Sequence, residues 1–337
     1  MRLFILSVLV VLASTSLSAQ RMGDRATKET ALNFLEKYSP SSHYAMQALA
    51  ELPNQFNIKG TQITTSGATS FLTWISERNE KGIIESLNTV VHESLHGFTS
   101  RYALQMLQEN PPADYQFGDD YSAFYMSKNE IYLVKHTEVF TSNVLKKRIP
   151  KELRTFRFNP YIAPKDNHLG SQVQGIYGLM DEWNAYYHGT KTAYDLFGYY
   201  RSKALDKDQK VYLEHVSNLA GTYFAYYEFK YYILKYLEVA KANYPKVYAD
   251  IMANESLRKV YGAIDEQFNS LLGLFETRLD TIENLVASEN RSSVYREDGY
   301  YFIGSSGVGL FSEEASKLKA ELSKPSMVRL DKSFRLR

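Results

Sequence analysis

His92-Glu93-Ser94-Leu95-His96 places two imidazoles four residues apart, with a carboxylate directly after the first. On a helix, residues i and i+4 project from the same face about one turn apart, so both histidines can reach a single metal ion. Glu93 lies on the flank of that face, near enough to hold a water molecule at the metal. The five residues therefore predict a zinc site with a built-in general base.

The sequence around this motif has the periodicity of a helix. Apolar residues recur at spacings of three and four beside the histidine face: Ile84, Leu87, Val91, Leu95 and Phe98. This pattern predicts a helix from about Lys81 to Gln108, which ends before Pro111-Pro112. The alternative interpretation is a pair of histidines on an ordinary buried helix, with no metal between them.

The composition restricts which atoms can bind the metal. The 337 residues include no cysteine, so thiolate ligands and thiol catalysis are excluded and the ligands have to come from His, Glu or Asp. The formal net charge of +1 gives no electrostatic argument for a nucleic-acid partner. No segment after the N-terminal region is apolar enough to predict a membrane span.

The N-terminal residues have the order of a secretory signal peptide. Arg2 precedes an apolar run from Leu3 to Ala13, and a short stretch of small and polar residues follows. Residues 1–19 are therefore predicted to be a signal peptide, cleaved after Ser18 or Ala19. The mature chain is expected to be secreted or periplasmic.

The remaining chain is predicted to form a predominantly helical α+β fold with two lobes. Residues 20–165 form the N-terminal lobe, with the motif helix and a β-hairpin insert, and residues 166–337 form a helical C-terminal lobe. Besides the motif helix, helical periodicity covers residues 28–52, 172–188, 191–204, 207–242, 246–253 and 255–289. Strands are expected within Thr61–Ile75, at Ser122–Met126 and Glu130–Val134 on either side of a turn, and at Thr155–Ile162, with a short strand or loop at Tyr300–Phe311.

A catalytic zinc generally takes three protein ligands and keeps one position open. The stretch from Gly175 to Gly189 carries the adjacent carboxylates Asp181 and Glu182, which point about 100° apart on a helix. Glu182 falls on a stripe whose other members are all small: Gly175, Gly178, Ala185 and Gly189. Such a stripe lets two helix backbones approach closely and presents one carboxylate to the opposite helix, so Glu182 is the predicted third ligand. The alternative is tight helix packing with Glu182 at a solvent edge.

These residues resemble the gluzincin branch of the zincin metallopeptidases, in which an HExxH helix supplies two histidines and a later helix supplies a glutamate. The resemblance rests on His92, Glu93, His96 and the helix of Glu182, and it does not extend over the full length. It implies a two-lobed zincin-like catalytic domain with bound Zn²⁺, a cleft between the lobes, and a peptide or protein substrate. The third histidine of metzincins is absent, because Tyr102 stands at its position.

The same resemblance suggests the other groups of the site. Gluzincins stabilise the oxyanion with a His or Tyr of the C-terminal lobe, and we expect Tyr177 or His188 to act here, with His215 as a further option. Metal-bound histidines usually donate their other ring N–H to an acceptor. The candidates close to Glu182 are Asp181, Asn184 and Tyr186.

The sequence thus predicts an exported zinc metallopeptidase. His92, His96 and Glu182 would hold the zinc, and Glu93 would activate the attacking water. Two alternatives stay open. One is an exported protein that binds zinc without catalysis, and the other is a zinc hydrolase of a non-peptide amide or ester.

Overall fold

The computed structural model describes residues 23–166, 168–206, 208–289 and 292–335. The predicted signal peptide, residues 1–19, lies outside them. Helices dominate the described chain and a few small antiparallel sheets accompany them, so the predicted predominantly helical α+β class is confirmed. In the described part of the chain, every helix is too short or too polar to cross a membrane.

The first helix spans residues 23–38, and further main helices follow it along the chain. They are α2 (Pro40–Glu51), α3 (Glu80–Glu109), α6 (Ile176–Asp195), α7 (Phe197–Asp206), α8 (Val211–Tyr223), α9 (Ala225–Asn243), α10 (Pro245–Ala253), α11 (Glu255–Glu289), α12 (Ser312–Leu322) and α13 (Pro325–Phe334). Single helical turns form α4 (Phe158–Tyr161) and α5 (Gly170–Val173), and 3₁₀ turns span Phe71–Trp74, Ser142–Lys147 and Lys151–Leu153.

The strands form three separate antiparallel sheets. They are β1 (Gln55–Ile58) with β2 (Thr61–Thr64), β3 (Tyr121–Ser127) with β4 (Glu130–Lys135), and β5 (Val294–Glu297), β6 (Tyr300–Ile303) and β7 (Ser306–Gly309) in that order. The predicted hairpin insert is thus β3–β4, with Tyr121 opposite Lys135. Within the predicted strand region Thr61–Ile75, the strand β2 covers Thr61–Thr64 and a 3₁₀ turn covers Phe71–Trp74.

The strand predicted at Thr155–Ile162 is wrong. This segment ends in the single turn α4, where the backbone N–H of Tyr161 donates to Arg157 O and that of Ile162 to Phe158 O. Its aromatic and β-branched residues resemble a strand, but Pro160 cannot donate to a sheet and is tolerated in the first turn of a helix. The region predicted as one helix over 207–242 is two helices, α8 and α9, which meet at Phe224.

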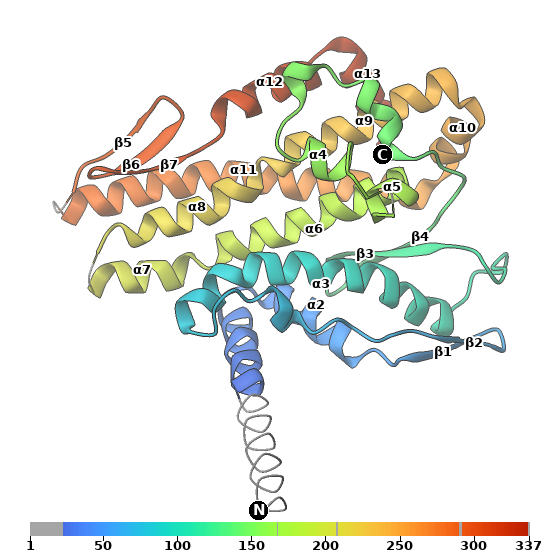
Figure 1. Cartoon of the computed structure of the whole chain (residues 1–337), viewed down its shortest axis with the longest axis horizontal. Helices are drawn as coiled ribbons and strands as arrows, with labels where there is room; N and C mark the ends of the chain where they lie inside the picture. The colour runs from blue at the N-terminus through green and yellow to red at the C-terminus, as the bar shows by residue number, and fades with distance from the viewer. Residues whose placement is uncertain (1–22, 167, 207, 290–291, 336–337) are drawn as a thin grey trace, which may run out of the picture.

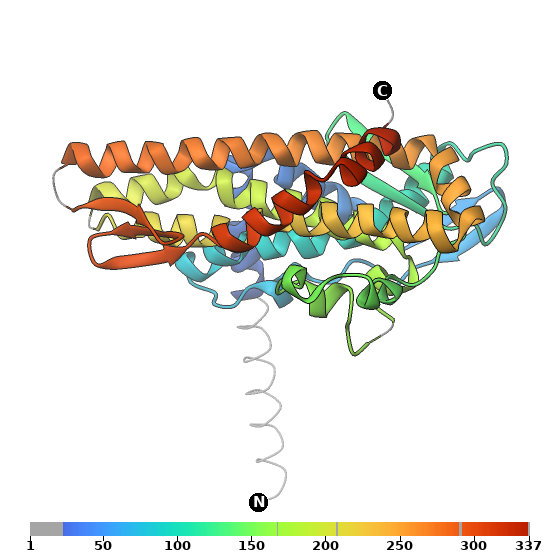
Figure 2. The same cartoon turned by 90° about the horizontal axis from the view of Figure 1, so that it is seen from above.

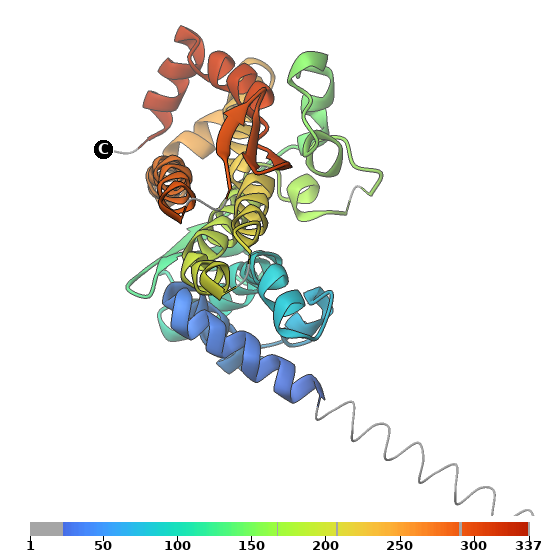
Figure 3. The same cartoon turned by 90° about the vertical axis from the view of Figure 1, so that its left-hand side faces the viewer.

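The long helices lie side by side along the long axis of the molecule (Figure 1). Packing pairs α3 with α6, and α6 in turn with α8, α9 and α11. Seen from above, α11 extends along one side, while α12 and α13 cross the bundle over α9 (Figure 2). The end-on view places α2 and α3 on one side of α6 and α11 on the other (Figure 3).

Helix α3 is stabilised by hydrogen bonds at both ends and by the burial of one apolar face. The side chain of Asn79 caps the N-terminus by accepting from the backbone N–H of Gly82 at 2.8 Å. At the other end the backbone N–H of Asn110 donates to Met106 O, just before the two prolines. The predicted apolar stripe is fully buried, from Ile84 through Phe98. The helix therefore matches its prediction to within a residue at each end.

Two buried apolar clusters meet at the contact between α3 and α6. One centres on α2 and α3, and the other on α6, α8, α9 and α11. The backbones approach closely at Gly189 of α6, where a Cβ would lie 2.8 Å from the backbone oxygen of Asn88. Gly178 is equally confined, since a Cβ there would lie 2.2 Å from the backbone oxygen of Gly170 in α5. The stripe of small residues thus places Glu182 between two points of near contact.

The buried histidine His215 should make the fold sensitive to acid. It lies between the rings of Phe197 and Tyr200, at centroid distances of 5.4 and 5.2 Å, and neither of its ring nitrogens makes a hydrogen bond within the described chain. Burial, with a smaller contribution from Arg278, lowers the pKa of His215 to about 3. The unfolded chain, with a histidine pKa of about 6.5, binds this proton first as the pH falls. Stability is therefore complete above about pH 6.5 and declines toward pH 3, by up to about 1.4 kcal/mol per pH unit from this group.

We expect His215→Leu to flatten this acid-side decline, because leucine cannot be protonated and gives up no hydrogen bond. Urea unfolding of both proteins between pH 7 and pH 4 measures it. His168→Leu, at an exposed position, is the matched control and should keep the original slope. Equal slopes for wild type and His215→Leu would contradict the assignment.

Candidate metal centre

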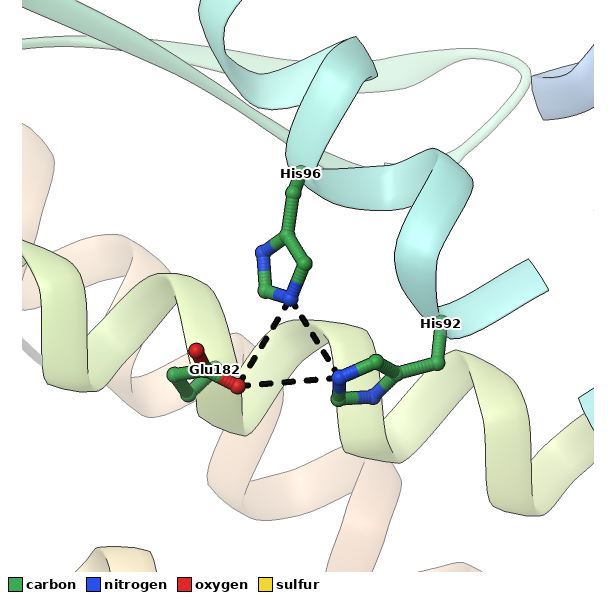
Figure 4. A group of neighbouring side chains, drawn as sticks. All are labelled: His92, His96 and Glu182. Atoms are coloured by element: carbon green, nitrogen blue, oxygen red, sulfur yellow. Dashed lines mark hydrogen bonds and ion pairs between the residues drawn. The ribbon is translucent and has the colours of Figure 1, made fainter. Parts of the chain in front are cut away.

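Three side chains from two helices converge on one point (Figure 4). The Nε2 atoms of His92 and His96, both on α3, are 3.3 Å apart. Oε2 of Glu182, on α6, lies 3.6 Å from each of them. The three donor atoms therefore form a nearly equilateral triangle, and they belong to the three residues predicted as ligands.

This triangle has the dimensions of one face of a zinc tetrahedron. With zinc–ligand bonds of about 2.0–2.1 Å, neighbouring ligand atoms of a tetrahedron are roughly 3.3–3.4 Å apart. Oε2 of Glu182 is buried and makes no hydrogen bond within the described chain. A buried carboxylate oxygen without a donor is costly unless a cation compensates it. The two imidazoles and this oxygen thus fit a divalent metal by distance and by donor type.

The groups behind the donors orient the histidines. Oδ2 of Asp181 lies 2.7 Å from Nδ1 of His96, which directs the Nε2 lone pair of that ring toward the centre. His92 has a backbone hydrogen bond with Ala185, and the ring of Tyr186 packs against it at a centroid distance of 4.4 Å. Among the predicted acceptors, Asp181 therefore serves His96 and Tyr186 contacts His92 through its ring. Asn184 is buried, and its amide makes no hydrogen bond within the described residues.

The charges around the centre favour a cation. Burial raises the pKa of Glu182 to about 7, opposed by His96 and increased by Asp181 and Glu93. Burial lowers the pKa of His96, but the carboxylates of Asp181, Glu182 and Glu93 outweigh it and raise that pKa to about 10. Burial also lowers the pKa of His92, and the positive charges of His96 and Arg157 add to this. Three carboxylates thus lie close together, and a divalent ion would compensate their negative charge.

Glu93 lies beside the ligands on a cleft of about 540 Å³. Its carboxylate is half-buried, and burial raises its pKa, while His96 opposes that shift. A base whose pKa is moved toward neutrality is better matched to proton transfer near pH 7. The other walls of the cleft come from α3, from β3 and from the segment that carries α4 and α5. They include Thr99, Ser100, Tyr121, Ser122, Tyr161, Ser171 and Gln174.

The two residues predicted to stabilise the oxyanion do not line this cleft. The hydroxyl of Tyr177 lies 2.9 Å from the backbone nitrogen of Thr137 and 3.2 Å from Nδ2 of Asn254, both of which donate to it, and its ring stacks on His136. Nε2 of His188 is bound to the backbone oxygen of Tyr125 at 2.7 Å. Both side chains are fully buried. We correct the prediction accordingly: Tyr177 and His188 are packing residues that join α6 to the β3–β4 hairpin.

The further options fail for the same reason. His215, on α8, is enclosed in the core against the rings of Phe197 and Tyr200 of α7 and does not line the cleft. Sequence reasoning overlooked Tyr161 of α4, which lines the cleft. Its hydroxyl lies 2.9 Å from that of Tyr186, and its presence near Glu182 lowers the pKa of that carboxyl. The only signal for it in the sequence was its place shortly before the second motif helix.

Comparisons with known proteins gave no match for the chain. No protein-family model matches it, and neither a curated protein nor a solved structure does. No family is shown. The function therefore has to be argued from the site alone.

Removal of the predicted ligands should remove the metal. We expect His96→Ala and Glu182→Ala to bind no zinc at micromolar concentration, because each leaves only two donors. Asp181→Asn should retain all three donors and lose affinity by about 10- to 100-fold, since His96 would lose its orienting carboxylate. Metal content by mass spectrometry and competition with a chelating dye measure both effects.

His168→Ala is the control for these variants, because His168 is exposed and does not line the cleft. Its zinc content should equal that of the wild type. Full zinc affinity in Glu182→Ala would exclude this carboxylate as a ligand. Stoichiometric iron in place of zinc would contradict the choice of metal.

Proposed function

We propose that this protein is a zinc-dependent peptidase of the gluzincin type. The observation that carries the proposal is the convergence of His92, His96 and Glu182 on one point, with Glu93 beside it on an open cleft. A purely structural zinc site is normally closed by four protein ligands and needs no neighbouring base. Here three donors stand beside a cleft and a carboxylate, which is the arrangement of a catalytic site.

The bound zinc would polarise the scissile carbonyl and make water acidic enough to react near neutral pH. Glu93 would accept a proton from that water as its oxygen attacks the carbonyl carbon. Glu93 would then pass the proton to the amide nitrogen as the carbon–nitrogen bond breaks, leaving a carboxylic acid and an amine, which exchange a proton to give a carboxylate and an ammonium group. Asp181 would hold the His96 ring in place throughout, since its hydrogen bond fixes which ring nitrogen faces the centre.

Tyr161 replaces the oxyanion-stabilising residues expected from the sequence. Burial raises the pKa of its hydroxyl, with the charge of Glu182 adding to the shift, so the group stays protonated and able to donate. It stands at the cleft wall beside the ligand Glu182. A donor at this place can stabilise negative charge that develops on the substrate carbonyl.

A peptide substrate suits the cleft better than a small ester. The walls carry hydroxyl and amide groups on both sides, from Ser100 and Thr99 of α3 to Ser171 and Gln174 near α5. Such groups can pair with the successive N–H and C=O groups of an extended peptide.

A hydrolase of a non-peptide amide or ester would use the same chemistry and is the second candidate. Export of the protein is part of the proposal and rests on residues 1–19.

Replacement of Glu93, the proposed general base, tests the chemical step separately from metal binding. We expect Glu93→Gln to keep zinc at the wild-type level and to lose peptide hydrolysis by at least about 100-fold, because the amide cannot accept the proton. Cleavage of a peptide library, with a chelator-treated sample beside it, measures the loss. Glu85→Gln, two turns earlier on the same helix, is the matched control and should keep full activity. Undiminished hydrolysis by Glu93→Gln would refute the mechanism.

The charge of the cleft predicts which peptides are cleaved. Among the described residues that line it, three are carboxylates and none is Lys or Arg, so no guanidinium or ammonium group of the lining can pair with a free C-terminal carboxylate. We expect amidation of a peptide's C-terminus to leave kcat/KM within about threefold, and acidic residues next to the scissile bond to lower it about tenfold relative to lysine. Matched synthetic peptides test this. A strict requirement for the free carboxylate would contradict it.

A further inference from the structure

A second hollow of about 450 Å³ lies on another side of α3. Its walls come from α2, from the helix over residues 23–38 and from the loop of residues 66–70. Arg101 and Ser94 are its contributions from α3. Arg101 is nine residues after His92, which places it about 180° around the helix from that ligand. The hollow is thus separate from the metal cleft, although both share one helix.

Arg101 is buried, and among the described residues no carboxylate pairs with it. Its side chain belongs to a residue only 7% exposed. Its Nη2 donates to the backbone oxygens of Leu52 and Pro53 at 3.2 and 3.1 Å and to Oδ1 of Asn54 at 3.2 Å. Its Nε is buried and makes no hydrogen bond within the described chain. The three acceptors of Nη2 are all neutral, so they do not neutralise the positive charge of the guanidinium.

The hollow around this arginine has one sign of charge. Lys28 is the other charged residue of its lining, and among the described lining residues there is no Asp or Glu. The other deeply buried arginine, Arg157, is paired with Glu228 at 2.6 Å. Buried charges in proteins are normally paired, because desolvation without a counter-charge is costly. A bound anion would supply the negative charge that is missing from the lining of the Arg101 hollow.

The remaining side chains of the lining indicate what kind of molecule would fit the hollow. Apolar side chains cover one part, namely Leu32, Met46, Leu49 and Phe71. Ser66, Ser70 and Ser94 add hydroxyl groups to the lining. A volume of this size lies within the range of small-molecule sites, which are mostly apolar with a few polar groups that orient the ligand.

We propose that this hollow binds a small carboxylate with an apolar chain. The carboxylate would accept from the guanidinium of Arg101, with Lys28 adding a second positive charge, and the chain would lie against the apolar wall. The inference is independent of the proposed peptidase activity, because none of these residues lines the metal cleft.

Titration calorimetry of the full chain with octanoate tests the proposal. We expect saturable binding of one octanoate per chain, and at least about tenfold weaker binding of the neutral octanamide, because an arginine–carboxylate pair is charge-assisted. Arg101→Gln should weaken octanoate binding about tenfold, and Lys28→Gln about threefold. The metal-site variant Glu93→Gln should bind octanoate like the wild type.

Two further variants keep the test valid if Arg101→Gln does not fold. Lys28→Gln changes an exposed residue, and Ala50→Phe fills the hollow from an exposed position of α2, so both should fold and bind octanoate more weakly. Arg25→Gln removes an exposed arginine elsewhere and should have no effect. Equal affinity for octanoate and octanamide, unchanged octanoate affinity in both Lys28→Gln and Ala50→Phe, or no saturable binding at millimolar octanoate would each overturn the proposal.

Discussion

The close contact between α3 and α6 is the constraint on which the site depends. The two histidines belong to α3 and the third donor to α6, so the donor triangle exists only at one separation of the two backbones. Gly189 fixes that separation, because a Cβ there would meet the backbone of Asn88, within one turn of His92. The contact also joins the two apolar clusters, which makes the geometry of the site a property of the whole core.

Behind the site, a buried ion pair holds the segment that forms one wall. Arg157 pairs with Glu228 of α9 and donates to the backbone oxygen of Gly221 at 2.7 Å. Its guanidinium also lies over the ring of Tyr186, 4.3 Å from the centroid, and that ring contacts His92. Fully buried pairs of this kind are costly to break, since the remaining charge would be uncompensated. The segment carrying Tyr161 is thereby anchored to the helical core rather than held by loop contacts alone.

The sequence predicted the parts of the site that depend on helical periodicity. His92 and His96 are one turn apart, and Glu182 follows from a stripe of small residues, so both arguments need only the geometry of a single helix. The orienting role of Asp181 was among the options for the same reason. These predictions concern neighbours within a few residues, where spacing determines direction.

What the sequence did not predict depends on contacts between distant segments. Tyr161 reaches the cleft because the segment before α5 folds back over α6, and no local pattern encodes that path. Tyr177 and His188 have the right residue types on the right helix, but their side chains face the β3–β4 hairpin. The strand predicted at Thr155–Ile162 failed because Pro160 and the ion pair of Arg157 decide that segment's conformation.

Asp181 and Glu182 are consecutive residues of α6, so a movement of this helix acts on both side chains at once. One carboxylate faces the shared point and the other holds the His96 ring, and both are fixed to consecutive residues of one rigid helix. Any twist of α6 about its axis would displace the donor and the ring support in the same movement. A rotation of α6 would therefore affect the third donor and the orientation of His96 together.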